Sequence, residues 1–353
     1  MKPPRLLVGL LPLLTALVTS AAPSTTIYEL KPGPGAGRHI VFLTGDEEYR
    51  GEEGLPMLAK ILSQRHGFKC TVLFALDPDG TINPDNSKSV GGAEALASAD
   101  AIVMLLRWRA WPDDAMKLFA EAVARGVPII GLRTATHSFL FRPGVPTSYV
   151  SYNNFGREVL GENWVSHWGP NRRGATRGVV EPGAESDPIM RGVSDLFGDS
   201  GAYEVHPADA KILVRGQVLK GMSPTDEPDT YREKRSSDQE EQGINDPLMA
   251  VAWTRRHENP GGKANRVFCT TMGAATDLVN EGLRRLVVNA VYWGFGLDVP
   301  ARANVAFVDA YAPSPYAFKG YRRGLTPADH ALGLVLRAGE AAPAKSTVTP
   351  VAK

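Results

Sequence analysis

Two histidines and one arginine are the residues of this chain best suited to carry chemistry. Arg133 and His137 belong to a polar run that follows the apolar stretch Pro128–Leu132, and His167 lies in an aromatic, glycine-rich segment. An unperturbed imidazole titrates near neutral pH, so either histidine can act as an acid or a base. The guanidinium of Arg133 offers a rigid fork of donors for a carboxylate, a phosphate or the vicinal hydroxyls of a sugar. We therefore predict that His137, His167 and Arg133 are catalytic.

A second group of polar and aromatic side chains is predicted to bind substrate. It combines an acidic loop after the first apolar stretch, two threonines beside the histidine, and tryptophans whose faces suit stacking against a sugar. Its members are Asp46, Glu47, Glu48, Tyr49, Thr134, Thr136, Trp164, Trp168, Glu204 and Trp253. Structural alternatives remain open: Arg133 could pair with the acidic loop, the threonines could cap a helix, and either histidine could be structural.

Three other chemistries also remain open. His137 and His167 together with a carboxylate, Glu204 or Asp46, would suit zinc or iron, but no short spacing such as His-x-x-x-His marks a metal site. We therefore predict no cofactor and keep a divalent metal as an alternative. A threonine of the polar run, activated by His137, would be a nucleophile. The acidic loop and Glu204 would supply the paired carboxylates of glycoside chemistry.

Short apolar runs predict the strands that position these residues. The strands are expected at Ile40–Thr44, Thr71–Leu76, Ala101–Leu106 and Pro128–Leu132. Apolar residues at helical spacing mark helices over Leu55–Leu62 and Met116–Val123. Strands and helices in alternation imply right-handed crossovers and a parallel sheet. The loops that follow the first, third and fourth strands should then gather at one edge, where ligands bind in open α/β sheets.

The second half of the chain predicts antiparallel additions to this sheet. Short strands are expected at Arg177–Glu181, Ala202–Val205, Lys211–Gln217, Leu248–Thr254 and Arg266–Thr271. The last two are joined by a turn of the Asn-Pro-Gly-Gly type, which is typical of a hairpin. Ser223–Asn245 is charged and is predicted to be an exposed loop, and an amphipathic helix follows over Leu283–Ala290. The fold class is therefore α/β.

The N-terminus has the order of a secretory signal peptide. Lys2 and Arg5 precede the apolar stretch Leu6–Val18, and small residues follow up to Ala22. We predict export to the periplasm or outside the cell, with no membrane attachment after cleavage. The domain assignment is a signal peptide over 1–22, a linker over 23–38, a domain over 39–299, a wrapping extension over 300–340 and a disordered tail over 341–353.

Composition excludes some classes of partner and cofactor. The formal net charge of the 353 residues is +1, and no basic run is interleaved with aromatics, so nucleic acid is not expected as a partner. Cys70 and Cys269 are the two cysteines, and both lie in apolar strand patterns. We interpret them as small core residues rather than nucleophiles, and their number and spacing exclude zinc sites built on four cysteines or on a finger.

An ordered set of motifs connects these elements to a known family. The motifs are Gly131-Leu132-Arg133-Thr134-Ala135-Thr136-His137, Gly161–Gly169 with His167, Asp187-Pro188-Ile189, Tyr203-Glu204-Val205, Asp246-Pro247 with Val251–Thr254, and Arg266–Gly273. In this order they resemble the ThuA-like (trehalose-utilisation) family, particularly its exported members. The resemblance runs from about His39 to Leu297. It implies a flavodoxin-like sheet similar to class I glutamine amidotransferases, helices on both faces, and carbohydrate utilisation.

One departure from that pattern limits the reaction. A glutaminase of this fold would present Gly-x-Cys-x-Gly after the central strand, whereas this chain has Gly131-Leu132-Arg133-Thr134-Ala135. A guanidinium cannot attack a carbonyl, so amide transfer through a thioester is excluded. The commoner ThuA pattern has a histidine at this position, and Asp277 follows a run without the histidine of the family's Gly-His-Asp turn. Roles of those histidines do not transfer.

These observations predict an exported ThuA-like protein that acts on a carbohydrate or sugar derivative. The expected chemistry is acid/base catalysis by His137 or His167 in a crevice at the carboxyl ends of the strands, in a hydrolase, lyase or isomerase. Two alternatives are a sugar-binding protein without catalysis and a structural or interaction protein that has lost the ancestral reaction.

Overall fold

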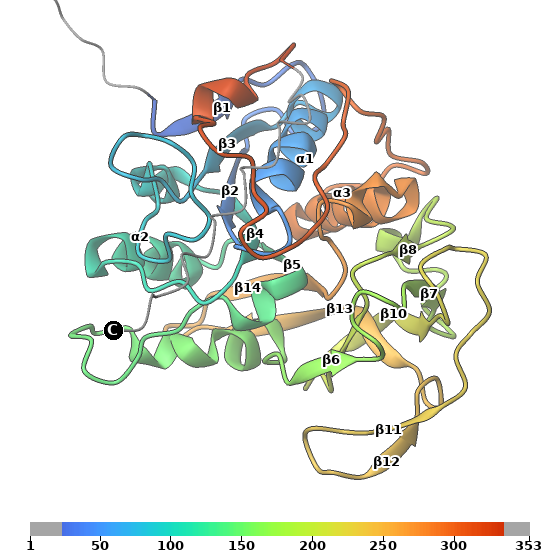
Figure 1. Cartoon of the computed structure of the whole chain (residues 1–353). Helices are drawn as coiled ribbons and strands as arrows, with labels where there is room; N and C mark the ends of the chain where they lie inside the picture. Colours follow the sequence, from blue (N-terminus) through green and yellow to red (C-terminus); the bar gives the residue numbers. More distant parts are fainter. Residues whose placement is uncertain (1–22, 335–353) are drawn as a thin grey trace, which may run out of the picture.

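The computed structural model describes residues 23–334 and has a mixed α/β fold built on one ten-stranded sheet (Figure 1). The strands, in sheet order, are β1 (Thr25–Tyr28), β3 (Lys69–Leu73), β2 (His39–Gly45), β4 (Ala101–Leu106), β5 (Ile129–Leu132), β14 (Ala264–Thr270), β13 (Met249–Glu258), β10 (Lys211–Val218), β7 (Thr176–Val180) and β8 (Phe197–Gly198). Two small ribbons lie outside this sheet: β6 (Ser166–Trp168) with β9 (Ala202–Glu204), and β11 (Arg232–Lys234) with β12 (Glu241–Gly243).

The five central strands, from β3 to β14, run parallel, and the strands on both sides of them are antiparallel. The sequence predicted all five strands to within three residues at each end, because each is an apolar run closed by polar residues. It assigned four of them to the parallel sheet. β14 was expected among the antiparallel additions, and that is correct for its pairing with β13 but wrong for its pairing with β5, which is parallel. The antiparallel strands β13, β10 and β7 were also expected. β1 lies within the segment we had assigned to a linker; it pairs with β3, so that part of the assignment is wrong.

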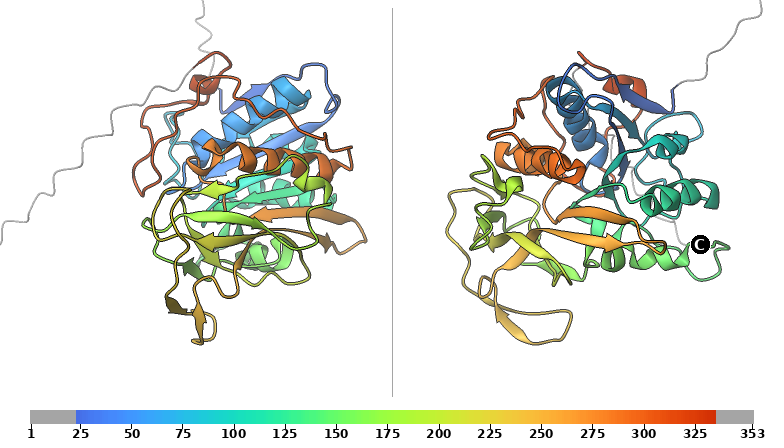
Figure 2. Two further views of the ribbon diagram at one scale, coloured as in Figure 1. Left: turned by 90° about the vertical axis from the view of Figure 1, so that its right-hand side faces the viewer. Right: turned by 180° about the vertical axis from the view of Figure 1, so that it is seen from behind.

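Helices cover the parallel strands. They are α1 (Gly51–His66), α2 (Asp113–Ala124) and α3 (Glu281–Phe295), and short helical turns lie at Ala93–Ser98, Arg133–His137, Val150–Asn154, Gly156–Leu160, Pro188–Met190, Asp277–Val279 and Pro327–His330. Alternate residues of β2 enter different hydrophobic clusters: Ile40 and Phe42 pack with α1 and α3, and Val41 and Leu43 pack with α2. Figure 2 shows α1 and α3 together on one side of the sheet.

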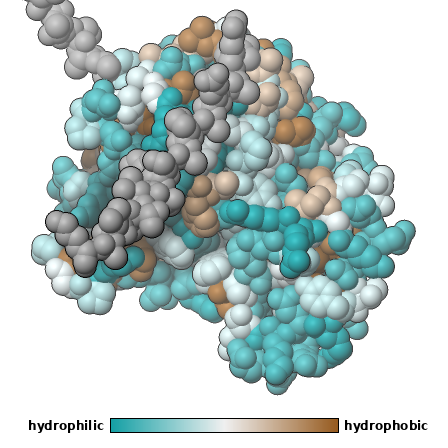
Figure 3. Space-filling model, viewed as in Figure 1, coloured by the Kyte–Doolittle hydropathy of each residue, from teal (hydrophilic) through white to brown (hydrophobic). Residues whose placement is uncertain are grey.

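The charged segment Ser223–Asn245 was predicted to be a loop, but it contains the ribbon β11–β12. This ribbon projects from the body (Figure 1), and the surface of that lobe is hydrophilic (Figure 3). Its strands carry Arg232–Lys234 opposite Glu241–Gly243, so opposite charges meet across the ribbon. The exposure that we predicted is observed, and the pairing is additional.

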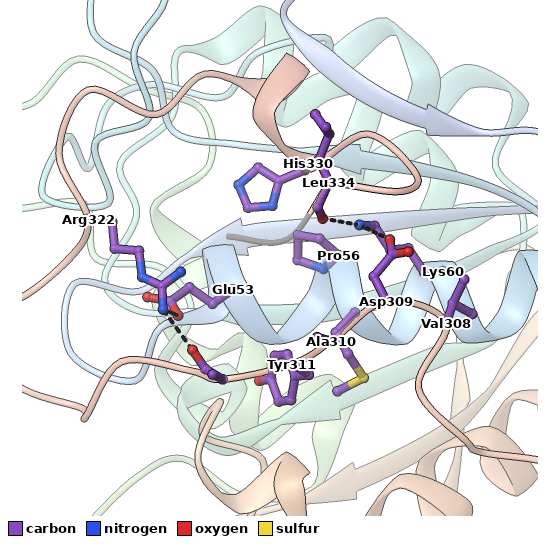
Figure 4. Close-up of a pocket in the computed structure, with 12 residues that line it drawn as sticks. Glu53, Pro56, Lys60, Val308, Asp309, Ala310, Tyr311, Arg322, His330 and Leu334 are labelled. Atoms are coloured by element: carbon purple, nitrogen blue, oxygen red, sulfur yellow. Dashed lines mark hydrogen bonds and ion pairs between the residues drawn. The ribbon is translucent and has the colours of Figure 1, made fainter. Parts of the chain in front are cut away.

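The C-terminal extension lies against α1 and returns to the edge of the sheet. The Nζ atom of Lys60 is 2.6 Å from Asp309 Oδ2 and 3.0 Å from the Ala331 carbonyl oxygen. Arg322 lies 3.5 Å from Glu53 and donates to the Ala312 carbonyl (Figure 4). A pocket with about 40 Å³ of free volume remains between α1 and the extension, which is room for a few waters and not for a sugar.

The predicted signal peptide, the disordered tail and the last residues of the wrapping extension lie outside the described residues. Within residues 23–334, no helix is long and apolar enough to cross a membrane. Cys70 and Cys269 are both free and buried, and they belong to different hydrophobic clusters. The interpretation of both as core residues is therefore confirmed.

Candidate functional site

The loops that follow the parallel strands meet at one edge of the sheet and are joined by main-chain hydrogen bonds. The amide of Arg107 donates to the Gly45 carbonyl at 2.9 Å and links the loop after β4 to the end of β2. The amides of Trp108 and Arg109 donate to the carbonyls of His137 and Ser138 at 2.9 and 2.7 Å. The edge is therefore a continuous wall formed by strands that are distant in sequence.

A cleft of about 400 Å³ opens at this edge. Its walls come from the loops after β2, β3, β4 and β5 and from the C-terminal extension. The lining residues are Glu47, Asp85, Ser87, Lys88, Trp108, Arg109, Ala110, Leu140, Arg142, Val145 and Lys319. Both the volume and the position, outside the carboxyl ends of parallel strands, are typical of a ligand site in an α/β fold.

A cluster of aromatic and imidazole rings adjoins the cleft. His137 packs against two indoles that also contact each other, with ring centroids 5.5 Å from Trp108 and 5.2 Å from Trp164. His167 lies 6.1 Å from Trp164 and 5.3 Å from Tyr203. The structure thus brings together His137, His167 and Trp164. Trp108 belongs to both features, because it lines the cleft and contacts His137; neither histidine lines the cleft itself.

Both histidines are neutral at physiological pH. Burial lowers the pKa of His137 well below its usual value, and the nearby guanidiniums of Arg107 and Arg133 lower it further. Burial, followed by the charges of Arg133 and Arg107, lowers the pKa of His167 to about 4. Nδ1 of His137 lies 3.2 Å from the hydroxyl of Thr136. A neutral imidazole can accept a proton or a hydrogen bond, and the lowered pKa makes each ring a weaker base than a free imidazole.

Arg133 is fully buried, and both of its terminal nitrogens are engaged, whereas its Nε has no hydrogen-bond partner. One terminal nitrogen donates to the carbonyls of Gly201 and Thr271 at 2.6 and 2.8 Å. The other donates to the Ser200 carbonyl and, at 3.1 Å, to the hydroxyl of Tyr49. The guanidinium carbon lies 4.4 Å from the centroid of the Tyr49 ring and 4.0 Å from that of Tyr203.

Two consequences follow for Arg133. It lies outside the residues that line the cleft, and no ion pair joins it to the acidic loop among the described residues. Its contacts therefore favour a structural role, in which the guanidinium holds the two tyrosines and the segment around Ser200. The catalytic role that we expected for Arg133 stays a prediction, and these contacts do not support it.

The acidic loop is held by specific partners. Asp46 is buried; it accepts hydrogen bonds from the amides of Glu48 and Tyr49 and from the hydroxyl of Thr134. Glu47 lines the cleft and pairs with Arg107 and Arg109. Burial and the charge of Asp46 raise the pKa of Glu47, while the two arginines oppose that shift. Glu48 accepts from Arg172 at 2.8 Å. Of these carboxylates only Glu47 lines the cleft.

Three other predicted substrate-binding residues have buried positions away from the cleft. Trp168 is 2% exposed and donates its indole N–H to the Ile244 carbonyl at 2.8 Å. Trp253 is fully buried and donates to the Leu160 carbonyl at 2.7 Å. Glu204 is buried and accepts from the amides of Ser236 and Ser237 at 2.7 and 3.0 Å, and these hydrogen bonds lower its pKa against the effect of burial. These contacts indicate core and loop-anchoring functions.

Strained backbone concentrates around the candidate site. Among residues 23–334, eight residues other than glycine have a positive φ, and five of them border the site: Arg50, Trp108, Arg133, Arg172 and Lys319. Left-handed backbone costs a residue with a side chain about 1 kcal/mol or more, and such residues gather at binding and catalytic sites. Trp108, at φ 47°, is the strained residue that contacts both the cleft and His137.

Glycine is required at both ends of the motif that contains His167. Gly161 has a φ of 102° and Gly169 has a φ of 92°, a region that side chains rarely enter. A Cβ atom added at Gly169 would also lie 2.8 Å from Cγ1 of Val218. These two glycines let the segment turn sharply so that His167 packs against Tyr203. This backbone geometry explains why the motif has glycine at both ends.

Sequence reasoning missed several residues of this site. Trp108 lies in the Arg-Trp-Arg-Ala-Trp run after β4, which we placed at the correct edge without choosing a residue from it. Lys319 and its neighbour Phe318 belong to the extension, where the aromatic and proline-rich run Tyr311–Arg323 was the signal. Phe318 is 49% exposed and lies beneath the guanidinium of Arg107. Lys88 and Arg142 carried no sequence signal.

Within the described part of the chain, no group of three or more histidine, cysteine, aspartate and glutamate side chains is arranged to hold a metal ion. The carboxylates proposed as partners of His137 and His167, Asp46 and Glu204, already accept hydrogen bonds from main-chain amides. Both would have to exchange these bonds for a metal.

Several solved structures are similar to this chain, among them the following two. A putative ThuA-like protein from Parabacteroides merdae ATCC 43184 is 13% identical, with a TM-score of 0.47, over 74% of this chain and 92% of that one. The N-terminal domain of mmIFT52 is 12% identical, with a TM-score of 0.38, over 74% of this chain and 99% of that one. No protein-family profile and no curated protein matches the sequence.

Proposed function

We propose that this chain is an exported ThuA-like protein that acts on a carbohydrate or sugar derivative at the cleft beside His137 and His167. The ordered motifs support the family, and the signal-like N-terminus supports export. The parallel strands follow the order second, first, third, fourth, fifth, which is the order of flavodoxin-like sheets. Separate hydrophobic clusters, one with α1 and α3 and one with α2, support helices on both faces.

One observation carries the functional part of the proposal: two neutral imidazoles lie within an aromatic cluster that shares Trp108 with a cleft of ligand size. Indole faces bind the apolar faces of sugar rings, and neutral imidazole is a base for a hydroxyl or for a C–H beside a carbonyl. The reaction fits a hydrolase, lyase or isomerase. Trp108 lines the cleft and contacts His137, so the imidazole lies next to the cleft without lining it.

Substitution of the histidines tests catalysis. The mature chain is screened for turnover of neutral, oxidised and phosphorylated sugars, and each hit is repeated with His137→Gln and His167→Gln. Loss of turnover of about 100-fold or more with retained affinity is expected for at least one variant, because a general base contributes about 10²–10⁴-fold. His257→Gln is the matched control, since that histidine lies on β13 away from the cluster. Equal turnover in all variants would refute acid/base catalysis by this pair.

A second candidate is a sugar-binding protein without catalysis. It is favoured by the partners of the carboxylates near the histidines: Asp46, Glu47, Glu48 and Glu204 are all held by amides, hydroxyls or arginines. None of these four carboxylates is therefore free to accept a hydrogen bond from an imidazole and orient it. A sugar that binds with micromolar affinity, is recovered unchanged and still binds His137→Gln and His167→Gln would support this candidate over the enzyme.

A further inference from the structure

We propose that the cleft selects sugar derivatives that carry a carboxylate or a phosphate, and that Lys88 and Arg142 bind this anionic group. This inference rests on the proposed function and adds the chemical class of the ligand. The charges, the apolar wall and the volume of the cleft support it.

The cations that line the cleft outnumber the anions. Glu47 is neutralised by Arg107 and Arg109, and Asp85 pairs with Lys319 at 2.8 Å. The lining therefore has four cations, Lys88, Arg109, Arg142 and Lys319, against the two anions Glu47 and Asp85. A cleft lined by an excess of one charge concentrates ligands of the opposite charge.

Two of these cations are available to a ligand. Lys88 and Arg142 are exposed, and within residues 23–334 neither has an acidic partner. They come from different loops, after β3 and after β5, and both line the same cleft. Arg109 contrasts with them, because its three nitrogens donate to Glu47 and to the carbonyls of Arg107 and Pro84. The surplus charge is thus concentrated on two free side chains.

The rest of the cleft favours a ring over a bare ion. Trp108, Ala110, Leu140 and Val145 give the lining an apolar side, and Val145 is 41% exposed. The volume of about 400 Å³ is far larger than a phosphate ion needs and is within the range of small-molecule sites. An apolar wall with two free cations matches a sugar that presents the faces of its C–H groups and carries one anionic substituent.

Binding measurements with matched sugars test the inference. The mature chain is titrated with glucose, glucuronate, glucose 6-phosphate and inorganic phosphate, together with equivalent sets of other hexoses, at low and at physiological salt. At least one acid or phosphate is expected to bind about tenfold or more tightly than its neutral parent. Its affinity should fall as salt rises, because partly exposed charges are screened. Comparing the acid with the phosphate identifies which anionic group is preferred.

Variants locate the effect. Lys88→Ala and Arg142→Ala should each weaken binding of the anionic sugar by about threefold to fivefold, the range expected for exposed ion pairs. Neither should alter binding of the neutral parent. Both residues are exposed, so the variants should fold. Lys220→Ala, also exposed and outside the cleft, is the control and should change nothing.

The outcomes separate the two proposals. If a neutral sugar binds as tightly as its anionic forms, or if both variants bind the anionic sugar like the parent chain, the inference is overturned and the proposed function stands. If no sugar of any class binds, both are overturned. Inorganic phosphate that binds as tightly as every sugar phosphate would show an anion site without a sugar site, which also contradicts the inference.

Discussion

Replacing Arg133 distinguishes a structural arginine from a catalytic one. In Arg133→Ala the carbonyls of Ser200, Gly201 and Thr271 lose their donor inside the protein. Each buried carbonyl left unpaired costs about 1–3 kcal/mol, and each of the two cation–π contacts contributes about 1 kcal/mol. Part of this loss of stability is offset, because the variant no longer has to bury a charged group away from water. We expect a net loss of about 3 kcal/mol of the free energy of unfolding.

The assay is urea unfolding followed by tryptophan fluorescence. With a slope of about 3 kcal/mol per molar urea for a chain of this size, the midpoint should fall by about 1 M. Arg133→Lys keeps the charge but not the fork of donors, so its midpoint should lie between those of the parent and the alanine variant. Arg302→Ala is the control: its side chain is 68% exposed and should change stability by less than about 0.5 kcal/mol.

The result that would refute this reasoning is a specific one. If Arg133→Ala unfolds at the parent's midpoint while sugar binding or turnover is lost, then the guanidinium acts on the ligand directly and our sequence-based assignment is right. If the midpoint falls and the folded fraction binds ligand with the parent's affinity, then Arg133 is a positioning residue for the tyrosines.

Three further predictions address acid stability, the extension and the thiols. Below pH 6.5 the unfolded chain protonates histidines that stay neutral when folded, including His167 and His330 with pKa values of about 4, so stability should fall from pH 6.5 to 4. His167→Gln should reduce the slope of the free energy of unfolding against pH by about 1.4 kcal/mol per pH unit, as measured by urea unfolding at a series of pH values. If that slope is the same in the variant and the parent chain, the low pKa of His167 is contradicted. Asp309→Ala removes the ion pair with Lys60, so it should speed amide hydrogen exchange across residues 305–334, as measured by mass spectrometry. Asp298→Ala is the control. If the two variants show equal protection in this segment, the Lys60–Asp309 ion pair does not hold the extension. Cys70 and Cys269 should resist thiol reagents in the folded state and should react in urea. A reductant should leave the midpoint of urea unfolding unchanged, because the two thiols are free. Rapid labelling of the folded chain would contradict their burial.

The parallel core was predictable because local chemistry marks it. Ala101–Leu106 is apolar at all six positions, and β4 has these bounds in the structure. Such runs are buried on both faces, so their ends coincide with the first polar residue. β1 and β6 were not predicted as strands, because they are four and three residues long and are held by partners distant in the chain.

The candidate site divides in the same way. The edge, the two histidines and Trp164 followed from strand order and residue type. Trp168 and Trp253 did not, because an indole suits a protein core as well as a sugar, and only burial and the partner of its N–H distinguish the two.

The sequence by itself determined the parallel strands, the edge at which their loops meet and the residue types available there. Tertiary structure decided which of those side chains bond to other groups of the protein and which are free to meet a ligand. Arg133 and Glu204 are surrounded by main-chain groups that come from distant segments, whereas Lys88 and Arg142 line one cleft from two separate loops. Whether a polar side chain meets a ligand or a carbonyl depends on contacts between residues far apart in the chain, and spacing in the sequence does not encode those contacts.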